Sequence, residues 1–252
     1  MRRWLSREAG KLGMNIMGVA NVERWEQHNE TPREFFPQSI WPWSRTVVVM
    51  GVQIFLPMIA TTPSVVYSEL YNTTNRLLDE AAYRLANALT VMSYRACFFP
   101  RDCYGDISAL VKKPEAAFSH VLAGRYAGLG TIGFAHTLLT PQYGPRVRLV
   151  SVITDAPIAP NDVMAGSLCS GCGLCAKNCP AGALRKRRGG KTQAIGDMDK
   201  HLCASYHKRL KDELRYPCGV CAAVCPVGAD REMYGASPIS PEGAAHCRNF
   251  GV

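Results

Sequence analysis

Eleven cysteines are present, and most of them fall into two closely spaced runs in the last third of the chain. Residues 169–180 read Cys-Ser-Gly-Cys-Gly-Leu-Cys-Ala-Lys-Asn-Cys-Pro, and residues 218–226 read Cys-Gly-Val-Cys-Ala-Ala-Val-Cys-Pro. The first run is the C-x2-C-x2-C-x3-C-P pattern with which bacterial ferredoxins hold [4Fe–4S] clusters. With Cys203 the two runs supply eight thiols, enough for two such clusters. We therefore expect the protein to carry single electrons.

The ligands can be divided between the clusters because the fourth cysteine of each ferredoxin run ligates the other cluster. The first cluster is then predicted to be ligated by Cys169, Cys172, Cys175 and Cys225. The second is predicted to be ligated by Cys179, Cys203, Cys218 and Cys221. Cys203 is the best fourth ligand because Arg215 occupies the position where a ferredoxin would have its cysteine.

Paired C-x2-C motifs are also found in zinc sites, which is the alternative interpretation. Zinc ribbons do not need a further C-x2-C step and a C-x3-C-P ending together, so two [4Fe–4S] clusters are favoured. The remaining cysteines, Cys97, Cys103 and Cys247, fit neither run. We expect them to be ordinary buried or free thiols.

Composition supports an ordinary globular protein with a modest positive charge. The chain has 252 residues, 47% of them hydrophobic, and a formal charge of +9. Each cluster with its thiolates contributes about −2, which lowers the net charge to about +5 and weakens the case for nucleic acid. Export signals and membrane-spanning segments are not evident, and thiolate ligands need a reducing compartment, so a cytoplasmic location is expected.

The elements before the cysteine runs predict a mixed α/β unit. Helices are expected over residues 2–12, 64–90 and 115–126, and strands over 15–20, 46–55, 94–99 and 146–154. The proline-rich connector at 155–162 marks a boundary. We therefore predict an α+β chain with an N-terminal domain over 1–160, a ferredoxin-like two-cluster domain over 161–235 and a C-terminal tail over 236–252.

The segment Gly128-Leu-Gly-Thr-Ile-Gly133 matches G-x-G-x-x-G, a dinucleotide-binding pattern. That interpretation requires a strand before the glycines and a helix after them. Here a predicted helix precedes the glycines, and Pro141 soon interrupts the segment after them. Close approach of the backbone to a large flat group, or to another backbone, is the favoured explanation.

Taken in order, the motifs resemble those of epoxyqueuosine reductases and their paralogues. They are the glycine segment, Leu-Leu-Thr-Pro-x-Tyr-Gly at 138–144, the strand ending at Asp155, the first cysteine run, Cys-Ala-Ser-Tyr at 203–206 and the second run. The resemblance implies a corrinoid-binding N-terminal domain like that of reductive dehalogenases, with cobalamin beside the nearer cluster. It also implies that the corrinoid is lined by Gly128, Leu129, Gly130, Gly133, Thr140 and Tyr143.

Two departures from that family concern the substrate. First, an aspartate that is proposed as the proton donor in that family is replaced here by Pro114. Second, members of that family carry C-terminal helical repeats that help to hold tRNA, whereas this chain ends soon after the second run. Candidate proton donors are therefore sought among the titratable residues near the glycine segment. They are His120 and His136, which flank it, and Asp106, Glu115 and Tyr104.

The motifs leave three hypotheses for function. The first is a cytosolic oxidoreductase that passes electrons through two clusters to a bound corrinoid and reduces an unidentified substrate. The second is a ferredoxin-type electron-transfer protein without its own substrate, and the third is epoxyqueuosine reduction on tRNA. A ferredoxin or flavodoxin is the expected electron donor, and the basic run at 185–191 is either a solvated loop or a docking site for that donor or for RNA. The oligomeric state is left open, a homodimer included.

Overall fold

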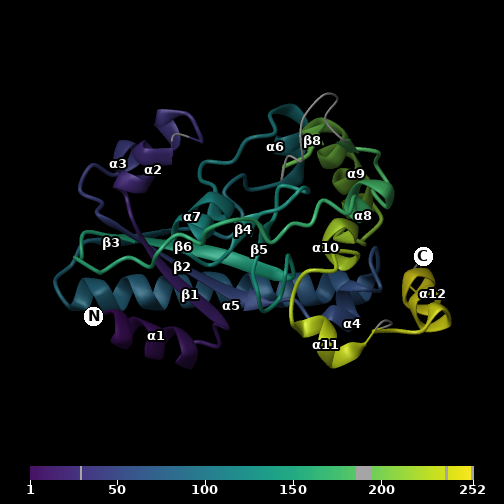
Figure 1. Ribbon diagram of the computed structural model, residues 1–252, viewed down its shortest axis with the longest axis horizontal. Coiled ribbons are helices and arrows are strands. Elements are labelled where there is room, and N and C mark those ends of the chain that lie inside the picture. Colours follow the sequence, from purple (N-terminus) through teal and green to yellow (C-terminus); the bar gives the residue numbers. More distant parts are fainter. Residues whose placement is uncertain (29, 186–194, 236–237, 251–252) are drawn as a thin grey trace.

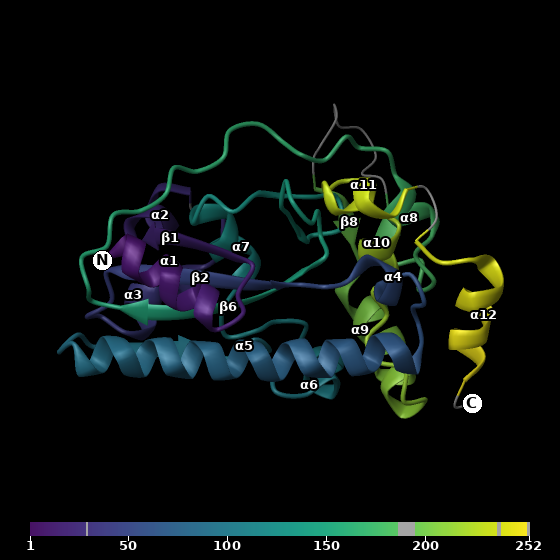
Figure 2. The ribbon, with the colours of Figure 1, turned by 90° about the horizontal axis from the view of Figure 1, so that it is seen from below.

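The computed structural model describes residues 1–28, 30–185, 195–235 and 238–250. A four-stranded sheet lies at the centre of the N-terminal part, with helices on both of its faces (Figures 1 and 2). The cysteine-rich part gathers at one end of this layered unit, and the two chain termini lie at opposite ends of the molecule. The predicted α+β class is confirmed.

The sheet has the order β1-β2-β6-β3, and every neighbouring pair is antiparallel. Its strands are β1 (Ile16–Asn21), β2 (Thr46–Gln53), β3 (Ala96–Phe99) and β6 (Val147–Thr154). Strand β2 is central and buried along nearly its whole length, as its run of β-branched and apolar residues predicts. The register pairs Val48 with Val152, so valines from two strands share one buried face.

One face of the sheet is covered by the long helix α5 (Val65–Val91), which Figure 2 shows running beneath it. The helix begins at Ser64, whose hydroxyl accepts a hydrogen bond from the backbone N–H of Tyr67 at 3.1 Å. Leu78, Leu85 and similar residues at three- and four-residue spacing pack on the sheet with α1 (Arg2–Lys11). The predicted periodicity of this helix is confirmed.

The other face is covered by α7 (His120–Tyr126) and by aromatic residues from the preceding loops. Trp25 and Phe118 are buried there, with ring centroids 6.0 Å apart. The remaining elements of this part are α2 (Glu23–His28), the 3-10 helix η1 (Arg33–Phe35), α3 (Pro37–Ile40), α4 (Leu56–Ile59), α6 (Ile107–Lys112), β4 (Thr131–Ile132) and β5 (Leu138–Leu139).

The proline-rich connector lies along the open edge of the sheet. Asn161 forms two hydrogen bonds with Val19 of β1, accepting from its N–H at 3.0 Å and donating its own N–H to its carbonyl at 2.9 Å. An edge strand presents unpaired backbone groups, so this pairing protects it. The predicted boundary is therefore attached to the sheet over part of its length.

The cysteine-rich part contains short elements joined by loops. They are α8 (Leu174–Lys177), β7 (Leu184–Arg185), β8 (Asp197–Met198), α9 (Lys200–Asp212), α10 (Val220–Ala223) and α11 (Asp230–Tyr234). Within the predicted tail, residues 241–249 form helix α12 (Pro241–Asn249), which begins at the capping hydroxyl of Ser240. No helix in the described ranges is long and apolar enough to cross a membrane. Most of the basic run, residues 186–191, lies outside the described residues.

Candidate redox site

The cysteines gather in two neighbourhoods that correspond to the two predicted ligand sets, but within the described residues no three of them stand in a geometry ready to hold a metal ion. Burial raises the pKa of Cys175, and the neighbouring thiolates of Cys225, Cys169 and Cys172 act in the same direction. These four residues are the predicted ligands of the first cluster. Cys172 is exposed, so this group lies at the protein surface.

The second group is more deeply buried. Burial raises the pKa of Cys221 to about 12, and nearby thiolates, chiefly those of Cys218 and Cys203, add to the effect. The pKa of Cys203 is raised to about 11 by burial and by the thiolates of Cys218 and Cys179. Thiols with raised pKa values remain protonated until a metal replaces the proton, so cluster assembly must release protons.

Left-handed glycines begin the helices that follow the ligands. Gly173 starts α8 with φ of 77°, and Gly219 starts α10 with φ of 69°. A Cβ at position 219 would lie 2.5 Å from the ring of Tyr67, so both conformation and space require glycine there. The helix that carries Cys221 is thereby packed directly against α5.

A cavity of about 1220 Å³ separates the second cysteine group from the sheet unit. Ordinary ligand pockets measure roughly 300–1,000 Å³, so this cavity can take an unusually large molecule. All four thiols of the second group, Cys179, Cys203, Cys218 and Cys221, belong to its wall. Apolar parts of the wall include Ile54, Ile59, Leu138, Leu149 and Leu184.

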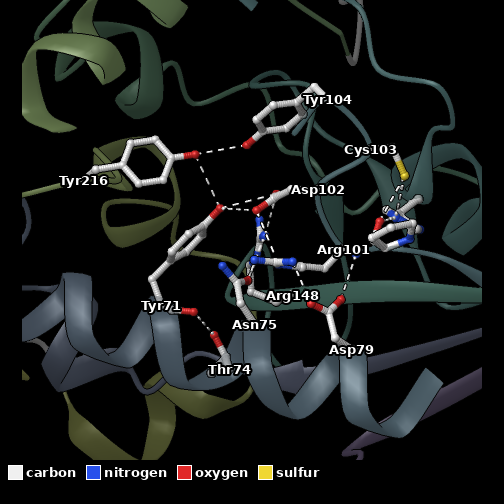
Figure 3. Close-up of polar contacts among 12 residues, drawn as sticks. Tyr71, Thr74, Asn75, Asp79, Arg101, Asp102, Cys103, Tyr104, Arg148 and Tyr216 are labelled. Atoms are coloured by element: carbon white, nitrogen blue, oxygen red, sulfur yellow. Dashed lines mark hydrogen bonds and ion pairs between the residues drawn. The ribbon is translucent and has the colours of Figure 1, made fainter. Parts of the chain in front are cut away.

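Three tyrosine hydroxyls converge in the same cavity beside an ion pair (Figure 3). The hydroxyl of Tyr104 lies 3.0 Å from that of Tyr216, which lies 3.4 Å from that of Tyr71. Tyr71 in turn donates to Asp102 at 3.2 Å, and Arg148 donates to the same carboxylate at 2.9 Å. The result is a continuous chain of hydroxyls that ends at an acceptor.

The electrostatics of this chain favour neutral phenols and an ionised carboxylate. Burial would raise the pKa of Asp102, but the charge and hydrogen bond of Arg148 hold it below its usual range. Burial raises the pKa of Tyr104 and of Tyr216 well above the usual value for tyrosine. Tyr104 and Tyr216 therefore keep their protons at neutral pH and can give them only to a strong base.

The predicted proton donor His120 lies in the cavity wall, but both of its ring nitrogens are occupied. Its Nε2 lies 2.8 Å from the carbonyl of Pro100 and must donate to it, which leaves Nδ1 to accept from the Ser151 hydroxyl at 2.9 Å. Burial lowers its pKa to about 4. His120 is therefore a neutral residue that ties α7 to the sheet, and its geometry disfavours proton transfer.

Besides His120 and Tyr104, three donors were predicted, and they differ in whether they border the cavity. His136 borders the cavity and donates from Nε2 to the carbonyl of Gly196 at 2.9 Å. Glu115 borders it too, and pairs with Lys113 at 2.9 Å. Asp106 lies outside the wall, where it caps α6 and pairs with Lys211 of α9.

None of the six predicted corrinoid-lining residues belongs to the cavity wall. A Cβ at Gly128 would lie 2.1 Å from the carbonyl oxygen of Asp162, and one at Gly130 would lie 1.9 Å from that of Leu139. These glycines allow one backbone to pass closely over another, the second of the two explanations offered by the sequence. The wall is instead formed by Ile132 and residues 135–138 just beyond them.

Several cavity residues were not predicted from the sequence. They are Tyr71, Asp102, Arg148, Tyr216 and His207. Tyr71 lies on the apolar face of a predicted helix, and Arg148 interrupts a predicted buried strand. A polar residue at a position that the pattern predicts to be buried could have marked Tyr71 and Arg148 as functional candidates. His207 of α9 stacks edge-on against Tyr216, and burial lowers its pKa to about 4.

Comparisons with known proteins agree with this site. A family model described as a 4Fe-4S dicluster domain matches residues 168–229. The chain is 38% identical over 96 residues to the epoxyqueuosine reductase of Listeria monocytogenes, covering 38% of this chain and 23% of that protein. It is 29% identical over 191 residues to the tetrachloroethene reductive dehalogenase of Desulfitobacterium hafniense, covering 74% and 30%. A reductive dehalogenase whose structure suggests a mechanism for B12-dependent dehalogenation matches with a TM-score of 0.66 and 21% identity, over 96% of this chain and 35% of that one.

The fold is thus that of a mixed N-terminal domain followed by a 4Fe-4S dicluster domain, which favours iron–sulfur clusters over the zinc alternative. More particularly, the chain is a relative of the epoxyqueuosine reductases and reductive dehalogenases, as its motifs predict. It spans 23% and 30% of the length of the two curated relatives.

Proposed function

We propose that this chain is a corrinoid-dependent iron–sulfur reductase. One observation carries the proposal: a single cavity of about 1220 Å³ is lined both by the four cysteines of the second group and by the three linked tyrosines. Electrons and protons can therefore reach the same space. A protein that only carried electrons would not need such a space beside its inner cluster.

The cavity suits a corrinoid because it is large and mostly apolar, with polar groups confined to a few positions. A bound cobalamin supplies a cobalt centre that can be reduced to a strong nucleophile, chemistry that protein side chains lack. The residues that would hold it are the apolar wall at Ile54, Ile59, Leu138 and Leu149 and the loop around Thr137. The relative described for B12-dependent dehalogenation shares this fold, which supports the proposal.

The two cysteine groups differ in burial, and this difference suggests the direction in which electrons would pass. Cys172 of the first group is exposed, whereas Cys218 of the second is buried and borders the cavity. Electrons from an external donor such as a ferredoxin or flavodoxin would enter at the exposed group. They would then pass to the buried group and leave it toward the cavity.

The tyrosine chain would supply the protons for reduction. Tyr104 would give its proton to the substrate, and Tyr216, whose hydroxyl lies 3.0 Å away, would donate a hydrogen bond to the phenolate that remains. The positive charge of Arg148, fixed by Asp102 and Asn75, also acts on Tyr104. That cation would stabilise the phenolate until bulk solvent restores the proton.

Cobalamin binding tests the proposal. Protein reconstituted anaerobically with iron, sulfide and cobalamin should retain about one cobalamin per chain through gel filtration. Ala135→Trp places a large side chain at the cavity wall and should abolish retention. Ala245→Trp on the exposed face of α12 is the matched control and should retain it. Free cobalamin in the wild-type sample would contradict the proposal and favour a plain electron carrier.

Epoxyqueuosine reduction is the third hypothesis from the sequence, and Pro114 argues against it. A strain lacking its own epoxyqueuosine reductase should keep epoxyqueuosine in its tRNA when this chain is expressed. Conversion to queuosine there would identify a tRNA-linked substrate and would overturn our expectation of a different one.

A further inference from the structure

Arg146 is a fully buried arginine whose contacts all lead to the loop that carries Cys225. Its Nε and one Nη donate to the two carboxylate oxygens of Asp230 at 2.7 and 2.6 Å. The Nη atoms also donate to the carbonyls of Cys225 at 3.0 Å and Val227 at 2.6 Å. The whole fork of the guanidinium is therefore used, from the start of β6, to position this ligand loop.

A second arginine acts on the same carbonyl. Arg231 donates from Nε to the oxygen of Cys225 at 2.7 Å and from an Nη to Ala223. Arg146, Asp230 and Arg231 together form what we call the arginine clamp. It carries two positive charges and one negative charge, and Arg146 and Asp230 are 0% and 7% exposed. Its net positive charge is consequently poorly screened by water.

The second cysteine group is held by neutral groups in the described part of the chain. Thr62 donates its hydroxyl to the carbonyl of Cys218, and the ring of Tyr67 packs against Gly219. The two clusters therefore sit in different electrostatic surroundings.

We propose that the arginine clamp sets the reduction potential of the cluster ligated by Cys225, raising it above the value that the same ligands would give without the clamp. Each reduction adds one negative charge to the cluster, and a nearby buried cation stabilises the reduced form. The outer cluster would then hold an electron readily at the point where the donor delivers it. This property depends on the clusters and the arginine clamp and on no particular substrate.

Potentiometric titration followed by electron paramagnetic resonance tests the proposal on anaerobically reconstituted protein. Arg146→Gln and Arg231→Gln should each lower the potential of one cluster and leave the other unchanged. A tenfold change in the one-electron equilibrium corresponds to 59 mV, and we expect at least that shift for Arg146→Gln. Cys172→Ser identifies the affected signal, because it alters an exposed ligand of the same cluster.

Asp230→Asn keeps hydrogen-bonding atoms in place but removes the negative charge, so it should shift the same potential upward. If Arg146→Gln lowers the potential of one cluster and Asp230→Asn raises it, the charge of the clamp controls that potential. Loosening of the loop would instead shift the potential in the same direction in both variants. The control Arg95→Gln removes a cation paired with Asp155 on the sheet unit and should shift neither potential. If Arg146→Gln fails to assemble clusters, Arg231→Gln and Asp230→Asn decide. Unchanged potentials, or shifts of the same sign in both, would overturn the proposal.

Discussion

The sheet unit and the cluster-binding segment are stabilised by different physical means. In the sheet unit, long apolar runs are buried between β2, β6 and α5. In the cluster-binding segment, the buried apolar residues of the described part are few: Ala183, Leu184, Ala204, Leu210, Cys218 and Ala222. Its loops are instead held by ligation and by polar contacts such as the arginine clamp. The comparison teaches that hydrophobic burial forms the platform, and coordination completes the redox site placed upon it.

The largest effect should come from removing a ligand. Cys203→Ser takes one of four thiolates from the second cluster, so bound iron should fall from about eight to about four atoms per chain. Iron and acid-labile sulfide analysis measures this. Cys247→Ser, which changes a cysteine outside both groups, is the control and should keep the full iron content. Equal iron loss in both variants would refute the ligand assignment.

In the sheet unit a large-to-small substitution should destabilise without any loss of ligands. Leu78 is fully buried where α5 packs on the sheet, so Leu78→Ala should cost about 2–5 kcal/mol of unfolding free energy. Urea unfolding followed by far-ultraviolet circular dichroism measures the change. Iron content per folded chain should stay near that of the wild type. Loss of clusters at unchanged stability would show that the two regions are not separable in this way.

Acid should weaken the platform through His120. Its pKa is lowered to about 4 by burial, whereas an unfolded histidine titrates near 6.5. The unfolded state therefore binds the proton first, so stability is full above pH 6.5 and falls as the pH drops toward 4. The loss should be about 1–3 kcal/mol. His120→Gln should reduce the slope of stability against pH between pH 7 and 5 in urea titrations, and an unchanged slope would contradict the buried, neutral state assigned to His120.

The smallest effect is expected at the connector. Asn161→Ala removes the side-chain acceptor for the N–H of Val19 at the edge of the sheet. One hydrogen bond of this kind contributes about 0.5–1.5 kcal/mol. Hydrogen exchange of the Val19 amide should accelerate while amides of β2 keep their protection. Faster exchange throughout the sheet would mean that the connector is part of the core.

Much of the platform could be predicted from sequence because its signals are periodic and local. The helix at α5 and the strands β2 and β6 lie close to their expected bounds. The predicted helix before the glycine segment begins only at His120, since Ser119 provides the capping hydroxyl for Leu122. The dicluster domain was predictable because cluster chemistry dictates cysteine spacing.

The cavity wall could not be predicted in the same way. The tyrosine chain combines residues 71, 104 and 216, and only the fold brings such distant residues together. The glycine segment suggested a ligand surface, yet its glycines serve contacts between backbones. Arg146 is the first residue of a predicted strand, and no pattern marks it as fully buried against the ligand loop. Long-range polar contacts of this kind leave no periodic pattern in a sequence.

The central claim is that the buried cysteine group delivers electrons into the cavity. The most direct test is anaerobic reduction of the reconstituted protein with cobalamin bound, followed by visible spectroscopy. The clusters would be reduced first, and the cobalamin spectrum should then change at the expense of the cluster signal. Cys203→Ser, with the inner cluster impaired, should slow that change by at least tenfold while still binding cobalamin. Reduction of cobalamin at the same rate in both proteins would contradict the account.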